Sequence, residues 1–396
     1  MFNTLPEPKP DAIIALIQAH AEDPRADKID LGVGVYKDGE GRTPVMRSVK
    51  EAERRLLERQ DTKTYTKLTG NPDFVEGMQT LVLGADRGGL AARLTGAQAP
   101  GGTGALRVLF DLTLRANPQA RFWYSAPSWP NHAAMLANLD VPADTYPYFD
   151  AETRGVDFDA MIAKLDGLGA GDVVILHGCC HNPTGANLTQ EQWERVTESA
   201  VSKGWMPLVD FAYQGLGDGL EEDAEGVRHM ASRMSRMMIA TSCSKNFGLY
   251  RDRAGCAIVL CEGAGEVPNV TATLASVNRL LYSFAPDHPA SVVAEILNDA
   301  ELRADWEAEL GEMRARINEL RTGLAEALRQ ETNSDEFDFV AEHRGMFSRL
   351  GVSEEVVKAM RADAGIYMVN DSRMNIAGLK ADRLRDFARA VVAARG

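Results

Sequence analysis

Short apolar runs alternate with longer amphipathic stretches through the middle of the chain. Five runs have the length and composition of buried strands, and they cover residues 121–125, 172–177, 206–210, 237–241 and 256–261. Between them, apolar positions recur at helical spacing, as in Leu106, Leu109, Phe110 and Leu114. Strands that alternate with helices predict a parallel sheet covered by helices, which is an α/β core.

The chain after residue 300 follows a different pattern. Apolar residues recur in steps of three and four from 301 to 330, at Leu302, Trp306, Leu310, Met313, Ile317, Leu320, Leu324 and Leu328. This spacing predicts one long helix, which is either a coiled-coil seam or, more often, a packed helix that bridges two domains. Residues 337–340, 345–348 and 366–369 have the composition of short strands. We therefore expect a smaller C-terminal α+β domain.

Charge and composition narrow the range of partners. The 396-residue chain carries 43 Lys and Arg against 57 Asp and Glu, and its net charge of −14 disfavours phosphate backbones and anionic lipid surfaces. No apolar run reaches the ~18 residues that a membrane-spanning helix needs. The start, MFNTLPEPKPD, lacks the basic and apolar regions of a signal peptide. We expect neither nucleic acid nor a membrane as a partner.

The cysteines indicate a reducing compartment. Five are present, and none forms a C-x-x-C pair; they are Cys179, Cys180, Cys243, Cys256 and Cys261. Buried, apolar free thiols explain this odd number best. We expect a cytoplasmic protein with no metal site.

A glycine-rich segment precedes one of the amphipathic stretches. Residues 100–106, PGGTGAL, hold three glycines, which let backbone N–H groups approach an anion, and the helix N-terminus adds partial positive charge. The segment is neither a P-loop nor a dinucleotide-binding pattern, so a tight turn and a phosphate-binding loop are about equally supported. Gly32 and Gly34 also fail the dinucleotide pattern, because Lys37 stands where a third glycine belongs.

Polar residues follow three of the predicted strands. Asn182 follows the strand at 172–177, Asp210 and Tyr213 follow the one at 206–210, and Lys245 follows the one at 237–241. Taken singly, these are a turn residue, a helix N-cap and a surface lysine. In an open α/β sheet, however, the carboxyl ends of the strands form the ligand-binding crevice. Pyridoxal 5′-phosphate requires this combination of groups, namely a lysine, a carboxylate, a phenol, an amide and a phosphate site.

Eight segments together resemble the class I aspartate/aromatic aminotransferases. They are LGVGVYKD, PGGTGALR, PSWPNH, HGCCHNPTGANLT, DFAYQGLGDGLEEDAEG, SCSKNFGLYRDR, RGMFSRLG and DSRMNIAG, in that order from about Pro24 to the C-terminus. The resemblance implies the type I fold of pyridoxal-phosphate enzymes and a homodimer with sites shared across its interface. It implies an N-terminal arm with part of the small domain in 1–44, a large cofactor-binding domain in 45–311, and the rest of the small domain in 312–396.

The resemblance also implies roles for the polar residues. Lys245 matches the lysine that bonds to the cofactor and moves the proton, and Asp210 matches the partner of the pyridine nitrogen. Tyr213 and Asn182 match the donors to the ring oxygen. Trp129 matches the ring that stacks on the cofactor, and His132 supports Asp210.

The same comparison of motifs implies phosphate and substrate contacts. The residues matched to the phosphate are Gly102, Thr103, Ser242, Ser244, Arg253 and, from the other subunit, Tyr65. Arg373 matches the arginine that grips the substrate α-carboxylate as a bidentate fork. Gly34, Trp129 and Asn182 lie where the family also contacts substrate.

The accepted side chain depends on a few positions. Arg279 matches the cross-subunit arginine for a distal carboxylate, although a helix-surface arginine is the plainer interpretation. Val35, Lys37 and Thr43 follow the aspartate-preferring pattern, whereas Thr64 departs from it and Phe284 stands where asparagine is usual. Phe284 is equally well explained as a packing residue. Residues 339–345 and 367–373 are similar to the aromatic branch.

We therefore predict an aromatic-amino-acid aminotransferase that also accepts aspartate and glutamate. It would transfer the amino group to 2-oxoglutarate by a ping-pong reaction through pyridoxamine phosphate. The alternatives are a strict aspartate aminotransferase, a pyridoxal-phosphate enzyme of another reaction class, and a non-catalytic descendant that kept the fold. Two arginines suited to a dicarboxylate disfavour another reaction class, and the intact Lys245, Asp210 and Tyr213 disfavour a non-catalytic protein.

Overall fold

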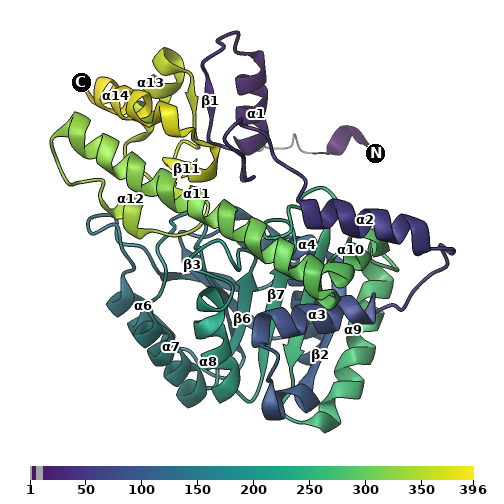
Figure 1. The fold of residues 1–396 in the computed structure, drawn as a ribbon. Helices are drawn as coiled ribbons and strands as arrows, with labels where there is room; N and C mark the ends of the chain where they lie inside the picture. Colours follow the sequence, from purple (N-terminus) through teal and green to yellow (C-terminus); the bar gives the residue numbers. More distant parts are fainter. Residues whose placement is uncertain (1, 6–11) are drawn as a thin grey trace.

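A seven-stranded sheet forms the centre of the computed structural model, which describes residues 2–5 and 12–396 (Figure 1). Its strands are β2 (Leu94–Pro100), β3 (Arg121–Ala126), β4 (Ala143–Pro147), β5 (Asp172–His177), β6 (Met206–Phe211), β7 (Met237–Ser242) and β8 (Ala254–Leu260). They lie in the order β2-β8-β7-β6-β5-β3-β4. Neighbours run parallel, except that β8 is antiparallel to both β2 and β7. The predicted α/β fold with a mostly parallel sheet is confirmed.

All five predicted core strands are present, with ends that shift by no more than two residues. Two further strands, β2 and β4, have no apolar run in the sequence. Gly96, Gln98 and Pro100 interrupt β2, and β4 is an edge strand whose residues are partly exposed. Their pairing comes from the neighbouring strands rather than from their own hydrophobic pattern.

Helices cover both faces of the sheet, which explains why its inner strands are apolar along their whole length. On β5, Val173 and Ile175 face one core, while Val174 and Leu176 face the other. The first core includes α4 (Gly101–Ala116), α5 (Pro130–Asn138) and α9 (Val267–Leu281). The second includes α2 (Arg47–Arg59), α3 (Pro72–Leu83), α6 (Phe158–Leu165), α7 (Gln190–Lys203), α8 (Glu225–Arg233) and α10 (Asp287–Asn298).

The predicted long helix is α11 (Ala300–Thr332), which runs from α2 and α10 to the C-terminal unit (Figure 1). That unit holds α12 (Phe339–Glu342), β9 (Phe347–Arg349), α13 (Glu354–Ala364), β10 (Ile366–Tyr367), β11 (Arg373–Asn375) and α14 (Leu384–Arg395). The N-terminal α1 (Ala12–Glu22) and β1 (Ile29–Asp30) join it, because β1 pairs with β10. Short 3₁₀ turns occur at Phe2–Thr4, Gly88–Arg93, Glu222–Ala224, Ala264–Glu266, Ile376–Gly378 and Ala381–Arg383.

One strand prediction in this unit is wrong. Residues 337–340 were expected to be a strand, but Phe339–Glu342 form α12, because Phe339 and Val340 turn their side chains into the core beside α11. The segment 345–348 contributes only its end, since β9 begins at Phe347. The division at 1–44, 45–311 and 312–396 stays a prediction; residue 311 lies inside α11, and residues 1 and 6–11 of the arm lie outside the described residues.

Two further features concern the described chain as a whole. Across 2–5 and 12–396, no helix is both long enough and apolar enough to cross a membrane. All five cysteines are buried and free, as expected for core thiols.

Candidate active site

A cavity of about 260 Å³ opens at the carboxyl ends of the central strands, where the sheet meets the small unit. It brings together most of the predicted site residues, namely Gly34, Gly102, Thr103, Trp129, Asn182, Asp210, Tyr213, Ser242, Ser244, Lys245, Arg253 and Arg373. Most of these residues lie at the ends of β3, β5, β6 and β7 or in the turns that follow them, at the start of α4, and in β11. Gly34 follows β1, and Arg253 directly precedes β8. The cavity thus lies at the strand ends where the sequence predicts a binding crevice.

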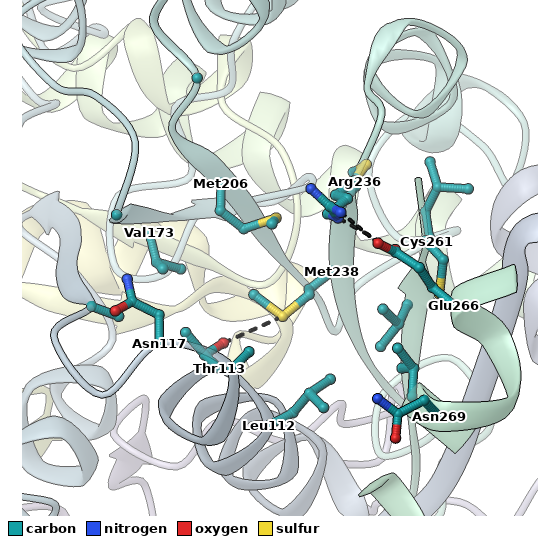
Figure 2. A pocket seen from close by; sticks show the side chains of 18 of the residues that line it. Leu112, Thr113, Asn117, Val173, Met206, Arg236, Met238, Cys261, Glu266 and Asn269 are labelled. Carbon is teal, nitrogen blue, oxygen red and sulfur yellow. Dashed lines mark hydrogen bonds and ion pairs between the residues drawn. The ribbon is translucent and has the colours of Figure 1, made fainter. Parts of the chain in front are cut away.

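A larger cavity of about 600 Å³ lies at the other end of the sheet (Figure 2). Its walls are largely apolar, with Leu112, Val173 and Met206 among them. Arg236 at its edge is neutralised by Glu266, and the Thr113 hydroxyl is bonded to Leu109 O. Size alone therefore does not mark the active site; the smaller cavity is the candidate because its ionisable groups converge without neutralising one another.

Lys245 lies in the turn that follows β7, and its amine faces the cavity. Nζ donates a hydrogen bond to Gly34 O and lies 4.7 Å from the centre of the Tyr250 ring. Burial, together with the charges of Arg253 and Arg373, lowers the pKa of Lys245 to about 7. A large fraction of the amine is therefore neutral near pH 7, which is the form that attacks a carbonyl carbon.

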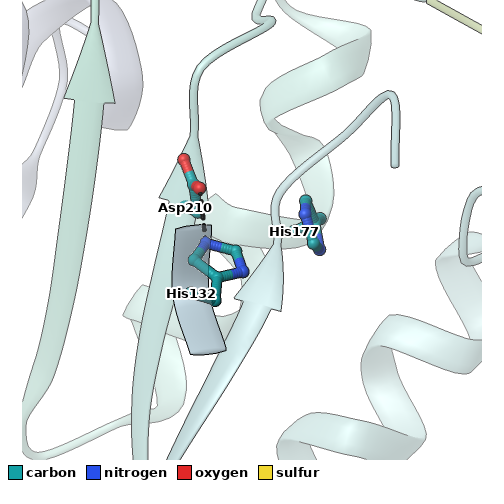
Figure 3. Close-up of side chains that lie close together, drawn as sticks. All are labelled: His132, His177 and Asp210. Atoms are coloured by element: carbon teal, nitrogen blue, oxygen red, sulfur yellow. Dashed lines mark hydrogen bonds and ion pairs between the residues drawn. The ribbon is translucent and has the colours of Figure 1, made fainter. Parts of the chain in front are cut away.

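Asp210 is tied to a histidine behind it, as Figure 3 shows. His132 Nε2 lies 2.9 Å from Asp210 Oδ2, and His132 Nδ1 lies 2.9 Å from the Ser128 hydroxyl. His177, the last residue of β5, is the register partner of Asp210 on β6. Both ring nitrogens of His177 lack a hydrogen-bond partner, and burial lowers its pKa to about 3. The carboxylate is thus held in place by a histidine, with a neutral imidazole beside it.

One end of the cavity is built to receive an anion. The N-terminus of α4 presents Gly102 and Thr103, beside Ser242, Ser244 and Arg253. Arg253 Nη1 lies 3.4 Å from the Ser244 hydroxyl. The glycines form the first turn of α4 instead of a loop before it, which corrects the sequence interpretation. A side chain at Gly101, where φ is +72°, would place its Cβ 2.4 Å from Arg253 Nη2.

Asn182 and Tyr213 approach each other across the middle of the cavity. Asn182 Nδ2 lies 3.5 Å from the Tyr213 hydroxyl, while Asn182 Oδ1 is buried without a partner. Burial raises the pKa of the Tyr213 hydroxyl above its ordinary value. Trp129 caps the N-terminus of α5, and its ring meets that of His132 edge-on at 5.4 Å. A flat polar ring placed here would meet donors on one edge and an indole on its face.

Arg373 closes the cavity from the small unit. Its side chain is only 5% exposed, and Nη2 donates to Gly32 O over 2.9 Å. Its Nε is buried with no partner, and the guanidinium lies 4.8 Å from the Phe347 ring centre. No carboxylate among the described residues pairs with it, although burial lowers its pKa by disfavouring the charge. A desolvated guanidinium with a free N–H fits an incoming carboxylate.

Two predicted residues, Tyr65 and Arg279, lie outside this cavity. The Tyr65 side chain is 80% exposed and stacks on Phe284, with ring centres 4.6 Å apart. Arg279, near the end of α9, is also exposed, and its Nη1 lies 3.3 Å from the Ser283 hydroxyl. Within one chain, the cavity is built without either residue.

Several cavity residues were not predicted. His177, Tyr250 and Phe347 line it, as do Ile13 and Ala212. The strand-end rule was sufficient to find His177, because it ends β5. Tyr250 and Phe347 lie inside the segments SCSKNFGLYRDR and RGMFSRLG but carry no chemical signal of their own.

Comparison with known proteins agrees with this geometry. Residues 26–391 match the family model for aminotransferases of class I and II. The chain belongs to this family. It is 51% identical over 393 residues to an aromatic-amino-acid aminotransferase of Paracoccus denitrificans, and the match covers 99% of each chain. It is also 43% identical over 394 residues to an aspartate aminotransferase of Escherichia coli K12, where the match covers 99% of this chain and 100% of the relative.

A solved structure shows the same fold as this aminotransferase. The aromatic-amino-acid aminotransferase of Burkholderia pseudomallei, covalently bound to pyridoxal phosphate, aligns with a TM-score of 0.97 at 39% identity, covering 100% and 99% of the chains. The cavity of the present chain fits such a group by its own chemistry. It offers a buried amine, an anion site at a helix N-terminus, a carboxylate, and an orphaned amide oxygen at Asn182.

Proposed function

We propose that this aminotransferase acts on aromatic amino acids and on aspartate and glutamate, with 2-oxoglutarate as acceptor and pyridoxal phosphate as cofactor. The observation that carries the proposal is the convergence of Lys245, Asp210 and Arg373 on one cavity, where Arg373 Nε is buried without a partner. The relatives named above, at 51% and 43% identity, support the aromatic and the acidic substrates.

The residues that hold the cofactor follow from the charges of the cavity. The start of α4, with Ser242, Ser244 and Arg253, would bind the phosphate, and Tyr65 would reach it from a second chain. Asp210, oriented by His132, would keep the pyridine nitrogen protonated. Asn182 and Tyr213 would bind the ring oxygen, while Trp129 would cover the ring face.

Bound pyridoxal phosphate supplies an electron-accepting ring that stabilises negative charge at the substrate Cα. Lys245 would supply the amine that holds the cofactor and would then move the proton from Cα through Nζ. Its lowered pKa, about 7, suits that task, because a general base works best when its pKa lies near the ambient pH. Burial, which disfavours the charged amine, is the main cause of this pKa.

Substrate orientation would come from Arg373. Its free Nε and the remaining guanidinium N–H groups would bind the α-carboxylate as a fork. Gly34 lies against Phe347, so a larger residue there would push on that ring. A Cβ at Gly34 would stand 2.8 Å from the Phe347 ring. Bound in this way, either class of substrate would have its Cα beside Lys245.

The exposed Tyr65 and Arg279 support a homodimer with shared sites. Both lie at one surface region with Phe284, outside the cavity of their own chain. In a dimer, Arg279 would meet the distal carboxylate of aspartate, while Phe284 would offer apolar surface to an aromatic side chain. The free state of all five cysteines supports a reducing, cytoplasmic location.

A steady-state comparison of aspartate, glutamate, phenylalanine, tyrosine and tryptophan, each with 2-oxoglutarate, tests this proposal. We expect turnover with both classes. Turnover with aspartate and glutamate alone would show a strict aspartate aminotransferase instead, which the pattern of Val35, Lys37 and Thr43 favours. An absorbance spectrum without a cofactor band, together with no turnover, would indicate a non-catalytic descendant.

A further inference from the structure

Two adjacent cysteines and an aspartate form a buried cluster behind the candidate active site. The Sγ atoms of Cys179 and Cys180 and a carboxylate oxygen of Asp223 lie within 4.8 Å of one another. None of the three lines the cavity that we assign to cofactor and substrate. We propose that Cys179, Cys180 and Asp223 bind a thiophilic divalent cation, of the class of Zn²⁺ and Cd²⁺.

The backbone brings the two thiols to one side. Adjacent residues of an extended strand point to opposite faces, but Cys180 has a φ of +50°, just beyond the end of β5. On a tetrahedral zinc with Zn–S bonds of ~2.3 Å, two sulfur ligands stand roughly 3.7 Å apart. Three donor atoms already within 4.8 Å therefore need shifts of only about 1 Å to meet that geometry.

Asp223 keeps one acceptor position available. Its Oδ2 accepts from the Gly215 and Gly217 N–H groups at 2.8 and 2.9 Å, and its Oδ1 accepts from Asp218 N–H at 2.9 Å. A carboxylate has about four lone-pair sites, so one remains for a cation. The three backbone bonds also fix the carboxylate, which reduces the entropy that a metal ligand loses on binding.

A small polar cavity of about 130 Å³ gives access to the cluster. Cys179 and Asp223 line it, together with the acidic residues Asp218, Glu222 and Glu225. Asp218 is paired with Arg344, but Glu222 and Glu225 form no ion pair among the described residues. The cavity would thus attract a cation, and it has room for a water molecule as the fourth ligand.

Charge balance supports an occupied site. Arg321 is fully buried beside Cys180, and among the described residues it donates only to backbone carbonyls and to the Ser348 hydroxyl, without a carboxylate partner. Both side chains lie against Gly345. Arg321 Nε donates a hydrogen bond to Gly345 O, and a Cβ at Gly345 would stand only 2.7 Å from Cys180 Sγ. Two thiolates and one carboxylate carry −3, which a divalent cation and Arg321 would neutralise.

Occupancy of the cluster would tie together two loops of the candidate active site. Cys180 stands two residues before Asn182, and Asp223 holds the backbone of residues 215–218 that follow Tyr213. Asn182 and Tyr213 are the two residues that we propose for the cofactor ring oxygen. A bound cation should therefore alter the cofactor absorbance as well as the rate.

The test titrates the cofactor-loaded enzyme with Cd²⁺, measured by equilibrium dialysis and by the ultraviolet thiolate-to-cadmium band. We expect one tight ion per chain, with about two protons released as the thiols ionise. Because the thiols must lose their protons to bind the ion, affinity should rise with pH. Cys179→Ser and Cys180→Ser should each weaken binding about 100-fold or more.

Cys261→Ser is the matched control, because Cys261 is also buried and free but lies just after β8, at the other end of the sheet. Unchanged affinity in both Cys179→Ser and Cys180→Ser, or an equal loss in Cys261→Ser, would overturn the proposal. If the serine variants fail to fold, the unmutated enzyme still decides, since the band intensity per bound ion reports the number of Cd–S bonds. Two bonds support the site, and none or one refutes it.

Discussion

Replacement of Arg373 by alanine is the most direct test of substrate recognition. The side chain is 5% exposed, its Nε has no partner, and no carboxylate of the described chain neutralises it. In the free enzyme it makes one hydrogen bond to Gly32 O and a contact with the Phe347 ring. These contacts leave most of its N–H groups for the α-carboxylate of the substrate.

The expected loss follows from that geometry. Removing one partner of a buried, hydrogen-bonded ion pair costs about 3–5 kcal/mol, which corresponds to a fall in kcat/KM of roughly 200- to 5,000-fold. Arg373→Lys keeps the charge but not the fork, so it should lose less than Arg373→Ala. Because every amino-acid substrate carries the α-carboxylate, aspartate and phenylalanine should lose by similar factors.

The assay is steady-state transamination of aspartate and phenylalanine, with the thermal midpoint measured in parallel. Arg349→Ala is the control, since Arg349 is the register partner of Arg373 on β9 but its guanidinium contacts Asp371. Loss of a desolvated charge offsets the loss of one hydrogen bond, so the midpoint of Arg373→Ala should change little. A loss below tenfold, or a loss confined to aspartate, would refute the assignment.

The other predictions concern Lys245, the interface and Phe284. Lys245→Met should abolish multiple turnover. In the cofactor-free chain, the same change should raise the free energy of unfolding by a few kcal/mol at pH 6. The reason is that a buried lysine with a pKa of about 7 destabilises the fold while it is protonated. This gain in stability should vanish as the pH rises from 7 toward 10.5. Urea unfolding at several pH values would measure it, and a gain that stays constant with pH would contradict the lowered pKa of Lys245. Arg279→Ala should lower kcat/KM for aspartate by an amount equivalent to about 3–5 kcal/mol of transition-state stabilisation, and kcat/KM for phenylalanine should fall much less. Equal losses for the two substrates would show that Arg279 has only a structural role. Mixed dimers of the Arg373→Ala and Tyr65→Ala chains should recover activity, because one site in each mixed dimer has neither change; no recovery after confirmed exchange would argue against shared sites. Phe284→Asn should remove an aromatic contact worth about 0.5–1.5 kcal/mol, so kcat/KM for phenylalanine should fall roughly 2- to 15-fold while kcat/KM for aspartate stays unchanged. An unchanged ratio of the two values, together with a lower thermal midpoint, would show that Phe284 only packs on Tyr65.

The hydrophobic pattern alone was enough for the central sheet and α11. A strand buried on both faces must be apolar throughout, as β5 is, and a helix packed along one side repeats every three to four residues, as α11 does. The same pattern missed β2 and β4, whose place is fixed by the strands beside them. It misassigned residues 337–340, because alternation in a four-residue run does not distinguish a strand from one helical turn.

For the site, the sequence placed Asn182, Asp210 and Lys245 at strand ends, and the resemblance to a family added their expected roles. Only the tertiary structure decided which atoms meet. His132 and Asp210 are 78 positions apart, yet they share a hydrogen bond of 2.9 Å. Contacts of this kind arise when packing of the cores brings distant segments together, and no local pattern of residues encodes them.

The cysteines also show that the sequence alone does not reveal which distant residues meet. From composition alone, Cys179 and Cys180 are core thiols, and their burial agrees with that. Asp223, more than forty positions later, reaches them only because β5 and β6 are neighbours and the turn after β6 folds back over the end of β5. The sequence thus determined which residues are buried, whereas the tertiary structure determined which buried polar atoms face one another, because that depends on how the layers pack.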